Sequence, residues 1–127
     1  MTIESAQLYL LQTQESFQMG GVVIAVGANE FVSNQTVPPG ELWWVWRFFA
    51  STTLGAGAAA NLAPSVKYST LNTPVGRYVS GVATENIRAP ADAGFWVQEG
   101  ATFGCTVQSQ TLAPTVQGNV VISRLRV

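Results

Sequence analysis

The sequence predicts an all-β fold, either a sandwich or a barrel, for this chain of 127 residues. Gly, Pro and Asn recur at short intervals, and the segments between them are rich in Val, Ile, Thr and aromatic residues. This spacing is typical of antiparallel sandwiches and barrels and differs from the pattern of alternating strands and helices. The chain shows neither an internal repeat nor a linker, and its length suits one domain over residues 1–127.

The first 18 residues allow two interpretations, a first strand or an N-terminal arm. The Leu, Gln, Glu and Ala content of residues 4–15 favours a helix. The alternation of Tyr9, Leu11 and Thr13 favours a strand, which we expect. The Ala-rich stretch 55–64 is predicted to be a surface loop. The expected strands are 7–13, 21–26, 30–37, 41–52, 65–70, 75–82, 93–98, 101–108 and 118–127.

The strand expected at 41–52 carries aromatic residues on both faces. Because successive side chains of a strand point to opposite faces, Leu42, Trp44, Trp46 and Phe48 are expected on one face. The other face then carries Trp43, Val45, Arg47 and Phe49. A small antiparallel sheet usually leaves one face to solvent, so a strand that is apolar on both faces needs a cover on each side.

Burying a Trp or Phe side chain contributes roughly 4–6 kcal/mol as an upper bound. We therefore expect one face of this strand in the core and the other against a neighbouring subunit. The residues predicted to form the core and the oligomer interface are Trp43, Trp44, Trp46 and Phe48. The alternative is that a loop such as 53–64 covers the outer face within one chain.

The composition excludes disorder and favours association. Charged residues make up 10% of the chain, against about 25% in typical soluble proteins. Apolar residues make up 47%, which is too many for a disordered chain. A surface with few charges is poorly protected against association. A monomer with a surface of Thr, Gln and Ser is the alternative.

The chain lacks residue types that several classes of function need. The chain has no His and one cysteine, Cys105, which is expected to be a buried thiol; we therefore predict no catalytic site, no metal site and no cofactor. Nucleic-acid binding is not expected, because the basic residues are few and scattered. We also expect no signal peptide and no membrane span.

Three motifs in the sequence are candidate sites. The stretch 55–60 matches the dinucleotide pattern G-x-G-x-x-A, but Pro64 follows too soon for a helix that would hold a nucleotide. The carboxylates at predicted turns and strand ends could in principle form a glycosidase pair; they are Glu30, Glu41, Asp92 and Glu99. Tyr78 and Trp96 could stack on a sugar or receptor ligand, and ordinary core packing is the alternative for each.

Three parts of the sequence resemble small structural proteins of tailed bacteriophages. The first is Thr36-Val-Pro-Pro-Gly40-Glu-Leu-Trp-Trp-Val-Trp, in which Pro-Pro-Gly-Glu leads into a Trp-bearing strand. The second is Phe95-Trp-Val-Gln-Glu-Gly100-Ala-Thr-Phe-Gly104, which is similar to the second hairpin of that family. The closing Gly118-Asn-Val-Val-Ile-Ser-Arg-Leu is similar to its terminal strand.

The resemblance implies a jelly-roll-like β-sandwich that acts in the virion without catalysis. It implies a capsid decoration (cement) or head-fibre protein, made in the host cytoplasm, that forms homo-oligomers, with a trimer favoured. The implied partners are the chain itself and the major capsid protein or other virion proteins, with no nucleic acid and no membrane. A tail or fibre component and a carbohydrate- or receptor-binding β-module remain the alternatives.

Overall fold

The computed structural model describes residues 2–23, 30–92, 94–108, 111–112 and 114–126. The elements in chain order are α1 (Ile3–Gln12), β1 (Glu15–Val23), β2 (Glu30–Thr36), β3 (Glu41–Thr53), β4 (Ala59–Tyr68), β5 (Leu71–Pro74), β6 (Val79–Val82), β7 (Asn86–Pro90), β8 (Phe95–Gln98), β9 (Thr102–Gln108) and β10 (Thr115–Arg126).

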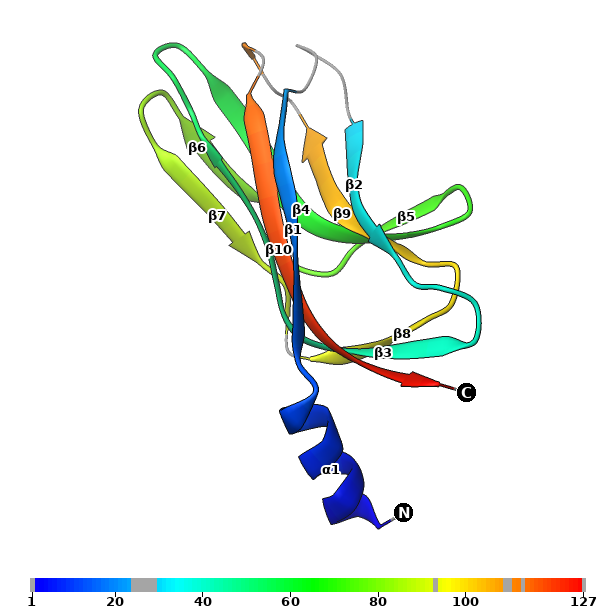
Figure 1. The fold of residues 1–127 in the computed structure, drawn as a ribbon. Coiled ribbons are helices and arrows are strands. Elements are labelled where there is room, and N and C mark those ends of the chain that lie inside the picture. The colour runs from blue at the N-terminus through cyan, green and yellow to red at the C-terminus, as the bar shows by residue number, and fades with distance from the viewer. Residues whose placement is uncertain (1, 24–29, 93, 109–110, 113, 127) are drawn as a thin grey trace.

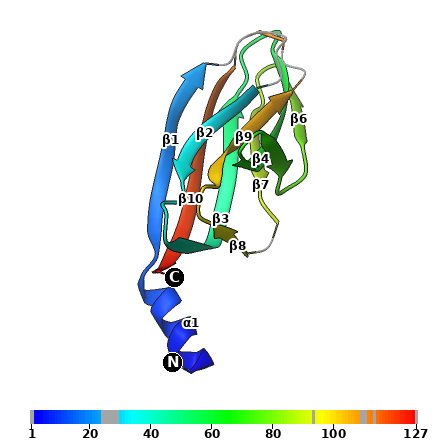
Figure 2. The ribbon, with the colours of Figure 1, turned by 90° about the vertical axis from the view of Figure 1, so that its right-hand side faces the viewer.

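The strands form two antiparallel sheets that face each other as a sandwich. Sheet A has the order β1-β10-β3-β7, with β8 pairing with another part of β3. Sheet B has the order β2-β9-β4-β5, with β6 pairing with β4. The chain crosses repeatedly between the sheets, and this order is that of an eight-stranded jelly roll in which two positions are each divided into two short strands. Figures 1 and 2 show the two layers, with α1 projecting from one end.

Most of the expected strands are confirmed, and the predicted fold class is correct. The expected strands at 30–37, 41–52, 93–98, 101–108 and 118–127 correspond to β2, β3, β8, β9 and β10. Of the strand expected at 21–26, residues 21–23 lie in β1 and the remainder lies outside the described residues. Of the strand expected at 75–82, residues 79–82 form β6. Strands β5 and β7 were not expected.

The strand expected at 7–13 is wrong, because this segment lies mainly in α1. The Thr2 hydroxyl caps the helix by accepting a hydrogen bond from the Ser5 amide at 3.1 Å. Glu4 lies in the first turn, where a negative charge favours the helix dipole. Thr13 ends the helix, and its hydroxyl donates to the Tyr9 carbonyl at 2.7 Å.

The surface loop expected at 55–64 is also wrong in its second half, which forms the start of β4. Leu62, Ala63 and Pro64 are buried there. A proline cannot donate a hydrogen bond to a neighbouring strand, so it is rare inside a sheet. At Pro64, however, the neighbour of β4 on one side changes from β6 to β5, and no ladder bond to its nitrogen is needed on that side.

Two glycine turns lie against each other at the end of the sandwich that carries β8. Gly40 and Gly100 have positive φ angles of 78° and 84°, which favour glycine. Each turn is closed by a backbone hydrogen bond of 3.3 Å, from the Glu41 amide to the Pro38 carbonyl in one and from the Ala101 amide to the Gln98 carbonyl in the other. The Gly40 amide also donates to the Glu99 carboxylate at 2.6 Å. These contacts fix where β3 begins.

Candidate interaction surface

A β-bulge in β3 changes which side chains face the core. In the pairing with β10, Val45 lies opposite Ile122 and Arg47 lies opposite Val121, so that Trp46 is an extra residue. Before the bulge Trp43 and Val45 are buried, and after it the buried residues are Phe48, Ala50 and Thr52. The bulge therefore reverses the alternation and leaves Trp46 and Arg47, which are neighbours in sequence, on the outer face.

The inner side chains of β3 form an aromatic stack between the sheets. The Trp43 ring lies parallel to Phe17 and Phe103, with centroid distances of 5.5 and 5.9 Å. Phe48 meets Phe103 edge to face at 5.5 Å. The expectation that Phe48 shares a face with Trp44 and Trp46 is therefore wrong, because the bulge turns Phe48 into the core.

Arg124 covers the open end of this stack. Its guanidinium lies 5.4 Å from the Trp43 ring centroid and forms two hydrogen bonds, of 2.6 and 2.9 Å, with the Glu15 carboxylate. It also contacts Glu41 at 3.3 Å. The hydrogen bond to Glu15 raises the pKa of Arg124 above its ordinary value. Glu41 in turn accepts a hydrogen bond from the Trp43 indole at 3.0 Å.

The outer face of sheet A carries a cluster of three tryptophans, Trp44, Trp46 and Trp96. Trp44 lies opposite Trp96 in the pairing of β3 with β8, and their ring centroids are 5.1 Å apart. Trp44 and Trp46 meet edge to face at 6.2 Å. The sequence therefore predicted correctly that both faces of this strand are aromatic, with Trp43 on one face and Trp44 and Trp46 on the other.

Helix α1 covers part of this cluster through its last turns. The Trp46 indole donates to the Ser123 hydroxyl at 2.8 Å, and that hydroxyl donates to the Leu10 carbonyl. A groove of about 480 Å³ separates the helix from the indole rings. The residues that line it are Gln7, Leu10, Leu11, Trp44, Trp46 and Trp96. We call these six residues the tryptophan groove.

Much of the apolar surface around the tryptophan groove stays exposed. Leu11 and Leu8 are each 54% exposed, and Trp96 is 44% exposed. Ile3, at the far end of α1, is 76% exposed. Scattered apolar residues are normal on a protein surface, but a contiguous apolar patch marks a binding surface. Residues 53–64, which were the alternative cover for this face, instead run from the end of β3 through a turn into β4 of the opposite sheet.

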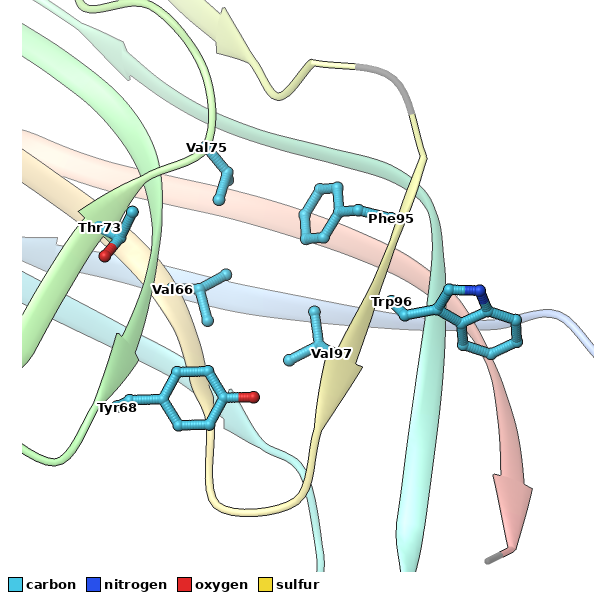
Figure 3. Close-up of a pocket in the computed structure, with 7 residues that line it drawn as sticks. All are labelled: Val66, Tyr68, Thr73, Val75, Phe95, Trp96 and Val97. Atoms are coloured by element: carbon cyan, nitrogen blue, oxygen red, sulfur yellow. The ribbon is translucent and has the colours of Figure 1, made fainter.

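A second cavity, of about 220 Å³, lies between β4, β5 and β8 at the edge of the sandwich. Figure 3 shows Phe95, Val97 and Val66 pointing into it, whereas the Trp96 ring points away on the other side of β8. The Tyr68 hydroxyl joins the two sheets by accepting a hydrogen bond from the Gln98 amide at 3.0 Å. Tyr78, the other predicted stacking residue, is 36% exposed and does not line either cavity that Trp96 lines.

The remaining candidate residues of the sequence lie at turns, at the surface or in the core. Of residues 55–60, the first four form a turn and the last two begin β4. Glu99 holds the Gly40 amide, Asp92 lies at the surface, and the Glu30 side chain lies outside the described part of the structure. Cys105 is fully buried, as expected. Among the described residues there is no group of three or more His, Cys, Asp or Glu that could hold a metal ion, and no helix there is long and apolar enough to cross a membrane.

No protein-family model and no curated protein matches this sequence. Among solved structures, a chain in the structure of infectious bursal disease virus Gx strain is similar, with a TM-score of 0.35 and 12% sequence identity. The similarity covers 87% of this chain but 30% of that chain, so this chain spans less than a third of its length. At this level of similarity no residue role carries over.

Proposed function

We propose that this chain is a non-enzymatic structural protein of a virion, namely a capsid decoration (cement) protein of a tailed bacteriophage. It self-associates, with a trimer as the favoured state, and it binds the phage head. The observation that carries the proposal is the tryptophan groove, a large aromatic surface on the outside of a jelly roll. The jelly-roll fold occurs in viral capsid proteins and in lectins, among others, so the fold alone does not determine the function. The residues on the surface must distinguish between these functions.

The tryptophan groove is suited to self-association because it combines rigid aromatic rings with an exposed apolar helix. Trp44 and Trp46 are held by each other and by Ser123, so little side-chain entropy remains to be lost on binding. Leu11 and Trp96 line the same groove and are exposed, and Leu8 is another exposed leucine of α1. Tryptophan is among the residues that most often dominate the binding energy of an interface.

The test is the solution mass of the full chain by light scattering, at low and high salt. We expect a trimer that persists at high salt, because burial of apolar surface is not screened by ions. Leu11→Ser and Trp96→Ser should each lower the mass at a given concentration. Leu71→Ser is the matched control, because Leu71 is 67% exposed on β5, away from the groove. A wild-type monomer at all concentrations would contradict self-association.

The N-terminal segment 1–18 is proposed to act as an arm that reaches a neighbouring subunit or the capsid. Helix α1 projects beyond the sandwich, and the described contacts that hold it involve its last turns, at Tyr9 and Leu10. Deletion of residues 1–12 should weaken assembly and the binding to capsids of the virus that encodes the chain. Unchanged assembly and capsid binding after the deletion would refute the arm.

A sugar- or receptor-binding module, on a tail or fibre, is the second candidate. It is favoured by the exposed ring of Trp96, which could stack on a sugar ring. If this is the function, addition of an oligosaccharide from a panel should shift the tryptophan fluorescence, and Trp96→Ala should abolish the shift. No change with any sugar, together with a stable trimer, would leave the decoration protein as the function.

A further inference from the structure

A slot next to the tryptophan groove combines positive charge with an aromatic ring. It lies on the outer face of sheet A between β3 and β7 and has a volume of about 240 Å³. Its walls include Trp46, Arg47, Phe49, Arg88, Pro90 and Asp92. The bulge leaves Trp46 and Arg47 side by side on this face. Both residues line the slot, and Trp46 also lines the tryptophan groove.

The Arg88 guanidinium lies over the Phe49 ring. Its guanidinium carbon lies 4.1 Å from the centroid of the Phe49 ring, and the pairing of β3 with β7 fixes both residues on one face. A guanidinium held over an aromatic ring by a cation–π contact can still donate hydrogen bonds from its N–H groups. Stacking therefore orders the side chain before any ligand binds.

Neither Arg47 nor Arg88 forms an ion pair with any residue that the structure describes. The ion pairs there involve Arg124, which Glu15 and Glu41 neutralise. Asp92 also lines the slot, but no carboxylate oxygen of it lies within ion-pair distance of either arginine. The slot therefore has a net charge of one positive unit, from two arginines and one aspartate.

We propose that this slot binds an acidic segment of a partner protein, with a carboxylate on Arg47 and Arg88 and an apolar neighbour against Trp46. Arginine matches a carboxylate with two parallel hydrogen bonds, which gives both affinity and orientation. The protein partner is favoured over a nucleic acid because the chain has six basic residues in all and a net charge of −1. A nucleic-acid site needs a longer basic track along the phosphates.

The experiment measures fluorescence anisotropy of a dye-labelled hexaglutamate peptide with the full chain. We expect binding at low salt that weakens as salt rises, and no comparable binding of hexaglutamine or of a thymidine hexanucleotide. Arg47→Gln and Arg88→Gln should each weaken binding roughly fivefold, the effect of about one partly exposed ion pair. Arg77→Gln is the matched control, since Arg77 is an exposed arginine in the connection between β5 and β6.

Three results would overturn the proposal. They are no hexaglutamate binding at low salt, an equal loss of peptide affinity in Arg88→Gln and Arg77→Gln, or binding of the thymidine hexanucleotide that is at least as tight as that of hexaglutamate. Thermal unfolding of each variant checks that it is folded. The solution mass is recorded on the same samples, because Arg47 and Arg88 lie outside the tryptophan groove. Loss of peptide binding with an intact oligomer therefore tests the slot apart from self-association.

Discussion

Trp43 and Trp44 are adjacent in the chain and lie in different layers of the molecule. Trp43 is 1% exposed between Phe17 and Phe103, where its indole donates to a carboxylate. Trp44 lies on the outer face with Trp46 and Trp96. The same residue type thus stabilises the core at one position and forms part of an outer aromatic cluster at the next, and only the direction of the side chain decides which.

Cys105 has a strong effect on how stability depends on pH. Burial raises the pKa of its thiol from 9.0 to about 12. The unfolded chain therefore loses this proton at a lower pH than the native protein does. The contribution to stability is full below about pH 9 and falls as the pH rises towards 12, with a slope of up to about 1.4 kcal/mol per pH unit.

We expect urea unfolding of the wild type to show this loss of stability above about pH 9 and the variant Cys105→Ala to lack it. Comparing the two removes the effect of other titrating groups, which both proteins share. A thiol reagent should also modify the native protein only as fast as it unfolds. Rapid modification of the folded protein would show that the thiol is accessible.

At the scale of elements, a buried hydroxyl contributes to the attachment of α1. Ser123 of β10 is fully buried, accepts from the Trp46 indole and donates to the Leu10 carbonyl near the end of the helix. This hydroxyl joins α1, β3 and β10. Loss of it leaves a tryptophan N–H and a carbonyl without their partner, and each buried unpaired group costs about 1–3 kcal/mol.

Ser123→Ala is therefore expected to lower the free energy of unfolding by about 1–3 kcal/mol and to loosen α1. Hydrogen exchange should become faster in residues 3–12 and change little in β4 and β9. Ser16→Ala is the control, because Ser16 also takes part in a side-chain hydrogen bond, from Asn119 at 2.8 Å, but is exposed. Equal exchange rates in α1 for wild type and Ser123→Ala would contradict this role.

The sequence predicted strands where the local signal is strong and failed where a tertiary contact decides. The aromatic run at 41–52 and the Pro-Pro-Gly-Glu turn were sufficient to locate β3 and its start. The short strands β5 and β7 carry few β-favouring residues and are set by their pairing with β4 and β3. In α1 the Thr2 cap was the overlooked signal, since it precedes a run of good helix formers.

The outer aromatic face of β3 was predicted only in part. The prediction assumed that side chains alternate strictly between the two faces, and that assumption cannot reveal a β-bulge. The aromatic character of both faces was evident from Trp43 and Trp44, but Phe48 was placed on the wrong face. The buried series Phe48, Ala50 and Thr52 is out of step with Trp43 and Val45, and this change of face is known from the structure. The basic slot could not be predicted, since Arg47 and Arg88 are brought together by pairing across the sheet.

At the scale of the whole molecule, the core forms two clusters that share strands. One contains Leu62, Val107 and Val116, and the other contains Trp43, Phe103 and Ile122. Strands β3, β4, β9 and β10 each contribute side chains to both. Neither cluster can lose its packing without disturbing strands that the other needs, so we expect residues 1–127 to unfold in one cooperative transition.

Leu62→Ala and Phe103→Ala test this expectation, one in each cluster. Each should lower the free energy of unfolding, by about 2–5 kcal/mol for the leucine and about 3–5 kcal/mol for the phenylalanine. In both variants, tryptophan fluorescence and circular dichroism should report the same midpoint in urea. The exposed control Leu71→Ala should change stability by no more than about 0.5 kcal/mol. Two separate transitions would show that the clusters unfold independently.

The position of β10 between β1 and β3 determines when the protein can fold during its synthesis. In sheet A, β10 pairs with both β1 and β3, so these two strands are not joined until residues 115–126 have left the ribosome. Translation adds about 5–20 residues per second, so the unpaired edge of β3 waits for several seconds in the nascent chain. During that interval an aromatic strand edge is open to pairing with other chains, and the cell must keep nascent copies apart until the last strand arrives.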